Sequence, residues 1–215
     1  MTINIGKKHV IIAVIAVVTI VVGFFGLSSM KNSKYEKNAK HCQENVHMLY
    51  YMSALMSSEI HDTWRNYIFD DKEYIDRNTG KFYERSWNMP DDADEKWCSS
   101  FSVAIAEKAN YYEKKGVKTT LDSLYSATKS LLTEMTPAPK KFNALHNDIV
   151  ELFHTTEAMY NCAVSPEGNL QSYTAEINSL SSDYKKQSSN VDIQIGEVDE
   201  FKKSEFELAA LMKFL

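Results

Sequence analysis

The sequence predicts an all-α protein, in which an N-terminal transmembrane helix is followed by an antiparallel bundle of about five helices. A small irregular or hairpin excursion is expected at residues 70–90. Three observations support this fold class: one long uncharged apolar run near the N-terminus, apolar residues at alternating steps of three and four, and only 7 glycines and 4 prolines in 215 residues. Glycine and proline are the residues that most disfavour helix interiors, so long uninterrupted helices are expected.

The apolar run covers residues 10–27, which are 18 residues without a charge. As a helix it would be ~27 Å long, close to the ~30 Å hydrocarbon core of a bilayer. We therefore expect residues 1–9 to form a short cytoplasmic tail, residues 10–28 a signal anchor within the lipid bilayer, and residues 29–215 the bundle domain. Residues 26–28 would suit a cleavage site, but the run exceeds the ~7 to 15 apolar residues of a typical signal peptide.

The lysines that flank this run give conflicting indications of orientation. Lys7 and Lys8 precede it, and four lysines follow it between residues 31 and 40. The count of positive charges alone favours a cytoplasmic body. We nevertheless expect an extracytoplasmic body, because a short basic tail before a long apolar run is typical of a signal anchor and long domains translocate largely regardless of charge.

Residues 31–69 contain neither glycine nor proline, and their apolar residues predict one long helix that serves as stalk and first bundle helix. The expected buried stripe is Val46, Leu49, Ser53, Met56, Ile60, Thr63 and Tyr67. Residues 70–90 break this pattern. Aromatic pairs on either side of residues 78–80 suggest a hairpin there, since Gly80 can adopt a positive φ.

Four more bundle helices are expected after the excursion. The second covers about residues 91–115, because Pro90 and the acids after it suit a helix start, and it should turn Trp97, Phe101, Ile105 and Tyr112 inward. The third runs from residue 119 or 120 to 135, and the fifth covers residues 170–187 antiparallel to the fourth. Residues 188–190 should break the fifth, before a last amphipathic helix over residues 197–215. The fourth helix, residues 139–163, has the most regular stripe: Phe142, Leu145, Ile149, Leu152, Thr156, Met159 and Ala163.

The charge of the body disfavours a nucleic-acid role. Residues 31–215 hold 29 acidic and 22 basic side chains, a net charge of −7. Such a surface has no basic footprint for a phosphate backbone. No glycine-rich phosphate loop, nucleophile elbow, His-Glu-x-x-His or Cys-x-x-Cys motif is present, so we predict neither an enzyme nor a cofactor.

Two Glu-x-x-His tetrads, Glu44 to His47 and Glu151 to His154, have the spacing with which some helical bundles bind two metal ions. Such ligands must face the core. The apolar stripes place both tetrads on outward helix faces, so solvated side chains are expected, and a metal-binding bundle remains only an alternative.

The three cysteines are too few for a disulfide scaffold. If successive helices alternate in direction, Cys42 and Cys162 lie near the membrane and Cys98 lies far from it. A disulfide between Cys42 and Cys162 is then the only reasonable pairing, and three independent buried thiols are the alternative.

Five aromatic residues around the excursion have two interpretations. Trp64, Tyr74, Phe82, Tyr83 and Trp87 can fold back as a cluster that caps the bundle, or can form an exposed partner-binding patch.

The sequence therefore predicts a noncatalytic, membrane-anchored bundle of the cell envelope that acts in binding, scaffolding or assembly. Its partner would be another protein or a second copy of the chain. The alternative is an extracytoplasmic ligand-sensing bundle. Because no second apolar run follows residue 28, such a sensor would need a partner subunit to signal.

Overall fold

The computed structural model describes residues 31–197, and the side chains of residues 34–195. The predicted tail and anchor at residues 1–28, and the predicted last helix from residue 198 onward, lie outside this part. No helix within residues 31–197 combines the length and the apolar character that crossing a bilayer requires. The elements in chain order are α2 (Lys31–Phe69), β1 (Tyr74–Asp76), β2 (Lys81–Tyr83), η1 (Ser86–Asn88), β3 (Glu95–Trp97), α3 (Phe101–Lys114), α4 (Val117–Glu134), η2 (Lys140–Phe142), α5 (Asn143–Val164) and α6 (Leu170–Glu197).

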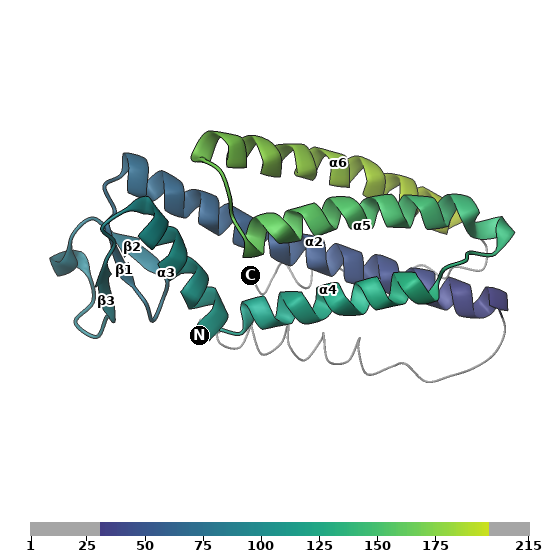
Figure 1. Ribbon diagram of the computed structural model, residues 1–215, viewed down its shortest axis with the longest axis horizontal. Coiled ribbons are helices and arrows are strands. Elements are labelled where there is room, and N and C mark those ends of the chain that lie inside the picture. Colours follow the sequence, from purple (N-terminus) through teal and green to yellow (C-terminus); the bar gives the residue numbers. More distant parts are fainter. Residues whose placement is uncertain (1–30, 198–215) are drawn as a thin grey trace, which may run out of the picture.

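The structure is predominantly helical, and its longest helix, α2, ends at Phe69 as the sequence predicted and covers the predicted range from residue 31 (Figure 1). The stripes predicted for α2 and α5 are confirmed as buried faces. Six of the seven positions named for α2 are buried, the exception being the half-buried Tyr67, and all seven named for residues 139–163 are buried. Burial of a continuous apolar stripe is the main source of helix stability in a bundle, so these faces fix how the two helices pack.

The helices run in an order that differs from simple alternation. Tyr35, near the start of α2, stacks on Phe142 just before α5, with ring centroids 4.8 Å apart. The two helices are therefore parallel. On α6, Tyr173 packs against Trp64 near the end of α2, and Asp192 accepts a hydrogen bond from Gln43 near its start. Helix α6 is therefore antiparallel to α2.

The parallel arrangement follows from the break between α3 and α4. Gly116, with φ +73°, lies between the two helices, which run one after the other in the same general direction (Figure 1). Together they form one broken segment that runs antiparallel to the 39-residue α2 (Figure 1). We call this segment the descending leg. The chain thus forms a bundle with four legs. These are α2, the descending leg made of α3 and α4, then α5, and finally α6.

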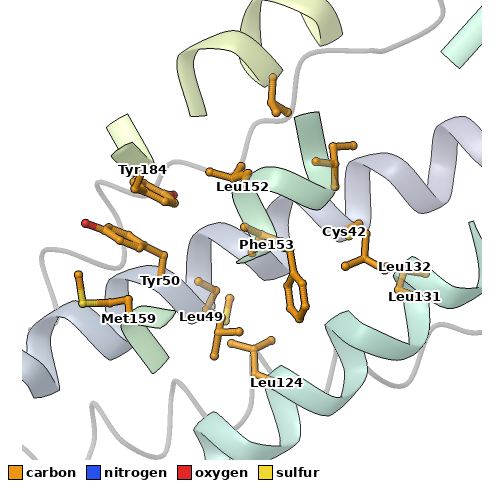
Figure 2. Packing of buried hydrophobic residues seen from close by; sticks show 14 of the residues in the cluster. Cys42, Leu49, Tyr50, Leu124, Leu131, Leu132, Leu152, Phe153, Met159 and Tyr184 are labelled. Carbon is orange, nitrogen blue, oxygen red and sulfur yellow. The ribbon is translucent and has the colours of Figure 1, made fainter. Parts of the chain in front are cut away.

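The main core lies between these legs and is rich in both aliphatic and aromatic side chains. Figure 2 shows Leu49 of α2, Leu124 of α4 and Phe153 of α5 in this cluster. Tyr50 and Tyr184 stack with centroids 3.4 Å apart, which joins α2 to α6.

A small antiparallel sheet closes the end of the bundle where α2 finishes, and its strand order is β2-β1-β3. The hairpin predicted within residues 70–90 corresponds to β1 and β2, with Tyr74 opposite Tyr83. Ile75 and Phe82 point to the bundle side of the sheet, where they form a second, smaller core with Cys98 and Ala104.

The predicted start of the second helix at residue 91 is wrong. Asp94 is tied to the hairpin by its backbone amide, which donates to Asp76 Oδ1 at 3.0 Å, and by an ion pair with Arg77 at 2.5 Å. These contacts keep the chain extended as β3. Helix α3 begins only at Phe101, after Ser100, whose Oγ accepts from the amide of Val103 at 3.3 Å.

The inward face predicted for that helix is also corrected. Trp97 and Phe101 are exposed, and Ile105 and Tyr112 are half-buried. The fully buried face of α3 consists of Ala104, Lys108 and Tyr111.

The predicted break at residues 188–190 is absent, because α6 continues to Glu197. Ser188 and Asn190 are weak helix formers, but Val191 is fully buried in the main core. Tertiary packing therefore overrides local propensity.

Candidate functional site

The first Glu-x-x-His tetrad is not on a solvated face as predicted. Glu44 and His47 are both half-buried, because α6 continues past the expected break and covers this side of α2. His47 Nδ1 hydrogen-bonds with the hydroxyl of Tyr184, and its Nε2 lies 3.8 Å from Asp192. The neighbouring His47 is the main cause that holds the pKa of Asp192 below its usual value. This tetrad therefore joins two helices.

The second tetrad faces solvent as expected and has different neighbours. Glu151 accepts a hydrogen bond from Gln187 at 3.1 Å, and His154 is exposed beside Glu157. Among the described residues, no group of three or more His, Cys, Asp or Glu side chains could hold a metal ion.

The cysteines do not form the predicted pair: Cys42, Cys98 and Cys162 are each free and buried. Tyr173 donates to the carbonyls of both Ser57 and Cys162, so Cys162 is level with Ser57. Ser57 lies fifteen residues beyond Cys42 on α2, which is roughly 22 Å along the helix axis. In Figure 2, Cys42 and Met159, which is one turn before Cys162 on α5, lie on opposite sides of the cluster.

The failure of this prediction has a topological cause. The expected proximity required α5 to run antiparallel to α2, whereas the broken descending leg makes them parallel. Burial raises the pKa of the Cys42 and Cys162 thiols to about 12 and that of Cys98 to about 11. All three are therefore protonated at neutral pH and weakly nucleophilic.

The five aromatic residues predicted as a cap or a patch separate into two groups. Trp64 is buried in the main core against Tyr173, and Phe82 is buried in the small core below the sheet. Neither can belong to an exposed patch. Tyr74 and Tyr83 are half-buried, and Trp87 is 73% exposed.

A continuous aromatic surface nevertheless exists on the outer side of the sheet. Successive strand residues alternate between faces, and Tyr74 on the central strand is in register with both Tyr83 and Trp97. These three residues form a row across all three strands. Because cross-strand neighbours on one face lie ~5 Å apart, they can bind a partner as one surface.

This row continues into an open hollow of about 600 Å³ beside the hairpin. Phe69, Tyr74 and Trp87 contribute rings to its lining, and Phe69 is 69% exposed. We call Phe69, Tyr74, Tyr83, Trp87 and Trp97 the aromatic sheet face. Sequence analysis did not assign Phe69 or Trp97 to a binding surface. Phe69 is the last residue of a long helix, and Trp97 reaches the surface only because β3 pairs with a strand about twenty residues earlier in the chain.

The rim of the hollow is acidic, with the carboxylates of Asp70, Asp71, Glu73 and Glu84. Trp97 Nε1 donates to Glu73 Oε2 at 3.1 Å, which orients the indole next to this rim. Arg85 supplies the positive charge at the hollow, and its guanidinium lies 5.0 Å from the Trp87 ring. The arrangement offers ring faces and hydrogen-bond acceptors.

The sheet is fastened to the bundle by Lys108, which is only 6% exposed. Its ammonium donates to Glu59 Oε2 of α2 at 2.8 Å and to the carbonyl of Gly80 in the hairpin turn at 3.1 Å. The rings of Tyr111 and Tyr112 lie 5.6 and 5.4 Å from the same nitrogen. One cation therefore joins α2, α3 and the hairpin.

Asp76 fixes the turn of the hairpin. Its carboxylate accepts from the Thr79 hydroxyl at 2.7 Å and from the amides of Asn78 and Asp94 at 2.9 and 3.0 Å. Burial alone would raise the pKa of Asp76, but these hydrogen bonds outweigh it and the pKa is lowered. The aromatic sheet face thus rests on a rigid support.

No protein-family model, curated protein or solved structure matches this chain.

Proposed function

We propose that the chain is a noncatalytic binding module of the cell envelope, tethered to the bilayer by residues 10–28, that recognises a protein partner through the aromatic sheet face. The observation that carries the proposal is the grouping of exposed rings. Of the seven large hydrophobic residues that are exposed within the described chain, five lie at the sheet end: Ile68, Phe69, Trp87, Trp97 and Phe101.

Exposed tryptophan is costly to leave in water and is enriched at protein interfaces, particularly among the residues that contribute most to binding. Trp97 is 54% exposed although it is part of a strand and its indole nitrogen has a partner. A monomeric protein gains nothing from displaying several such rings together, so contiguous exposed apolar surface indicates an interaction site.

The anchor and the face lie at opposite ends of α2 under this proposal. The described part of α2 starts three residues after the predicted span, and its 39 residues extend about 58 Å. The sheet is attached where α2 ends, so the face would be presented far from the bilayer surface (Figure 1). Because α2 is packed in the main core from Tyr35 to Trp64, the bundle itself would hold the recognition end away from the bilayer.

Photo-crosslinking in intact cells tests this proposal. A photoreactive phenylalanine analogue replaces Trp87 or Trp97, and matched variants carry it at Leu55 or Lys185, which are exposed positions elsewhere on the bundle. We expect a discrete adduct at the two sheet positions and none at the controls. An adduct of twice the chain mass would identify the partner as a second copy, and equal crosslinking at all four positions would refute the proposal.

The hollow supports a second candidate function, a ligand-sensing bundle that works with a signalling partner. The hollow is open and lined mainly by polar side chains, and its volume is about 600 Å³. Carboxylates and aromatic faces together favour an organic cation. Titration of the full chain with tetramethylammonium and spermidine, followed by tryptophan fluorescence, tests this alternative, which requires saturable binding that Trp87→Ala abolishes.

A further inference from the structure

The end of the bundle opposite the sheet has an unusual concentration of lysines. We call this end the base, and define it as residues 31–41, 134–147 and 193–197. Direct contacts bring these segments together: Tyr35 stacks on Phe142, Lys141 forms an ion pair with Glu36 at 3.3 Å, and Gln194 hydrogen-bonds with Asp148 just beyond the second segment.

The base differs in charge from the rest of the described chain. It holds six lysines and three glutamates, a net charge of +3, whereas the remainder of residues 31–197 holds 22 acidic and 13 basic side chains, a net charge of −9. The body therefore has one positive end on an otherwise acidic surface. The sequence alone shows the lysines before residue 41, but only the fold adds Lys140 and Lys141 to them.

The ammonium groups at the base are accessible. Lys34, Lys37, Lys140 and Lys141 are exposed. The Lys141 ammonium lies over the Phe142 ring, 4.5 Å from the centroid, and is paired with Glu36, while 42% of the side chain stays exposed. These groups can meet an anionic surface without refolding of the bundle.

We infer that the base lies against anionic lipid headgroups of the leaflet from which the body emerges. This inference rests on the proposed anchor at residues 10–28. Lys34 would be only about 9 Å of helix beyond residue 28, which is within roughly one Debye length of the membrane surface. Because Lys140 and Lys141 are held at the same level by the contacts of Tyr35 and Glu36, they face the same surface.

A lipid surface fits these observations better than a nucleic acid or a protein. The body as a whole is acidic and would repel a long polyanion that extended past the base, whereas a bilayer meets the base alone. The position of the predicted span also brings the leaflet to this end of the bundle and to no other.

Lysine acetylation on the full chain in nanodiscs tests the inference. The protein is reconstituted in phosphatidylcholine alone or mixed with phosphatidylglycerol, treated briefly with an acetylating N-hydroxysuccinimide ester, and analysed by peptide mass spectrometry. We expect Lys140 and Lys141 to react at least about threefold more slowly in the anionic bilayer, with the difference lost at high salt. Lys185 and Lys186, exposed at mid-bundle, should react equally in both lipids.

A charge-reversal pair provides the matched variants. Replacing Lys140 and Lys141 by glutamate should reduce the protection of Lys34, and the same change at Lys185 and Lys186 should leave that protection unchanged. Equal reactivity of the base lysines in both bilayers would overturn the inference. Alkaline carbonate extraction distinguishes failure of the lipid contact from failure of the anchor. A chain that resists extraction but shows no lipid dependence refutes only the contact of the base with lipid. A chain that is extracted refutes the anchor at residues 10–28 as well.

Discussion

Replacement of Lys108 by methionine should loosen the sheet from the bundle. Methionine has nearly the length and volume of the lysine stem, so the packing volume is retained while the ammonium and its cation–π contacts with Tyr111 and Tyr112 are lost. The change removes two hydrogen bonds, one to Glu59 and one to the carbonyl of Gly80.

The two lost hydrogen bonds contribute unequally. The Glu59 side chain is 55% exposed, so its carboxylate regains water, and the ion pair accounts for only ~0 to 1 kcal/mol. The Gly80 carbonyl bonds to Lys108 in a buried setting, and leaving such an acceptor without a partner costs ~1 to 3 kcal/mol. We therefore expect the free energy required to open the contact between sheet and bundle to fall by about 2 kcal/mol.

Hydrogen exchange of the full chain in detergent, followed by mass spectrometry, measures this loss. An opening free energy lowered by about 2 kcal/mol accelerates exchange about 30-fold in β1, β2 and α3. Exchange in the middle of α5 should change little, since its contacts are with the main core. Lys114→Met is the matched control, because Lys114 is exposed on the same helix. If Lys108→Met exchanged like this control, the fastening role of Lys108 would be refuted.

Three further predictions concern the backbone, pH and the thiols. Gly80→Ala should destabilise the sheet end more than Gly116→Ala by at least about 1 kcal/mol in thermal unfolding, since both have positive φ but only at Gly80 would a Cβ lie 2.7 Å from the Tyr111 ring; equal losses would contradict this. The lowered pKa of Asp76 means that its stabilising contribution is complete above the unfolded pKa of ~3.9 and is lost as pH falls through the lower folded pKa, so Asp76→Asn should weaken the acid dependence of exchange in the sheet; an unchanged pH profile would refute its role. The three buried cysteines should react slowly with maleimide in the native chain and all three should react after denaturation without a reductant; a single label under those conditions would show a disulfide.

Periodicity predicted the parts of the fold in which one helix face is buried along its whole length. The stripe from Val46 to Ile60 and the one from Phe142 to Ala163 each meet the same core throughout, so residue spacing alone identifies them. The half-buried helix α3 lies between two cores, with Ala104 facing one and Ile105 the other. No single stripe describes such a helix, and the predicted inward face was therefore wrong.

The candidate site was harder to predict because it depends on contacts between distant segments. The acids after Pro90 suit a helix start, yet Asp94 is held by Asp76 and Arg77, eighteen and seventeen residues earlier. Once these bonds form, β3 pairs with β1 and places Trp97 beside Tyr74. Local propensity contains no information about such a pairing, whereas Tyr74, Tyr83 and Trp87 could be named from their aromatic character and turn context alone.

A single break in the chain has consequences at both ends of the molecule. Because Gly116 divides one descending leg into α3 and α4 without reversing it, α3 stays at the sheet, where Lys108 holds the hairpin, and α4 continues to the base. The next helix must then start from the base, and this start brings Lys140 and Lys141 beside the first turns of α2. An additional reversal at Gly116 would have moved these lysines to the sheet end and removed the charge separation. The aromatic sheet face and the lysine-rich base therefore result from the same topology. A variant that changes the break at Gly116 should disturb both.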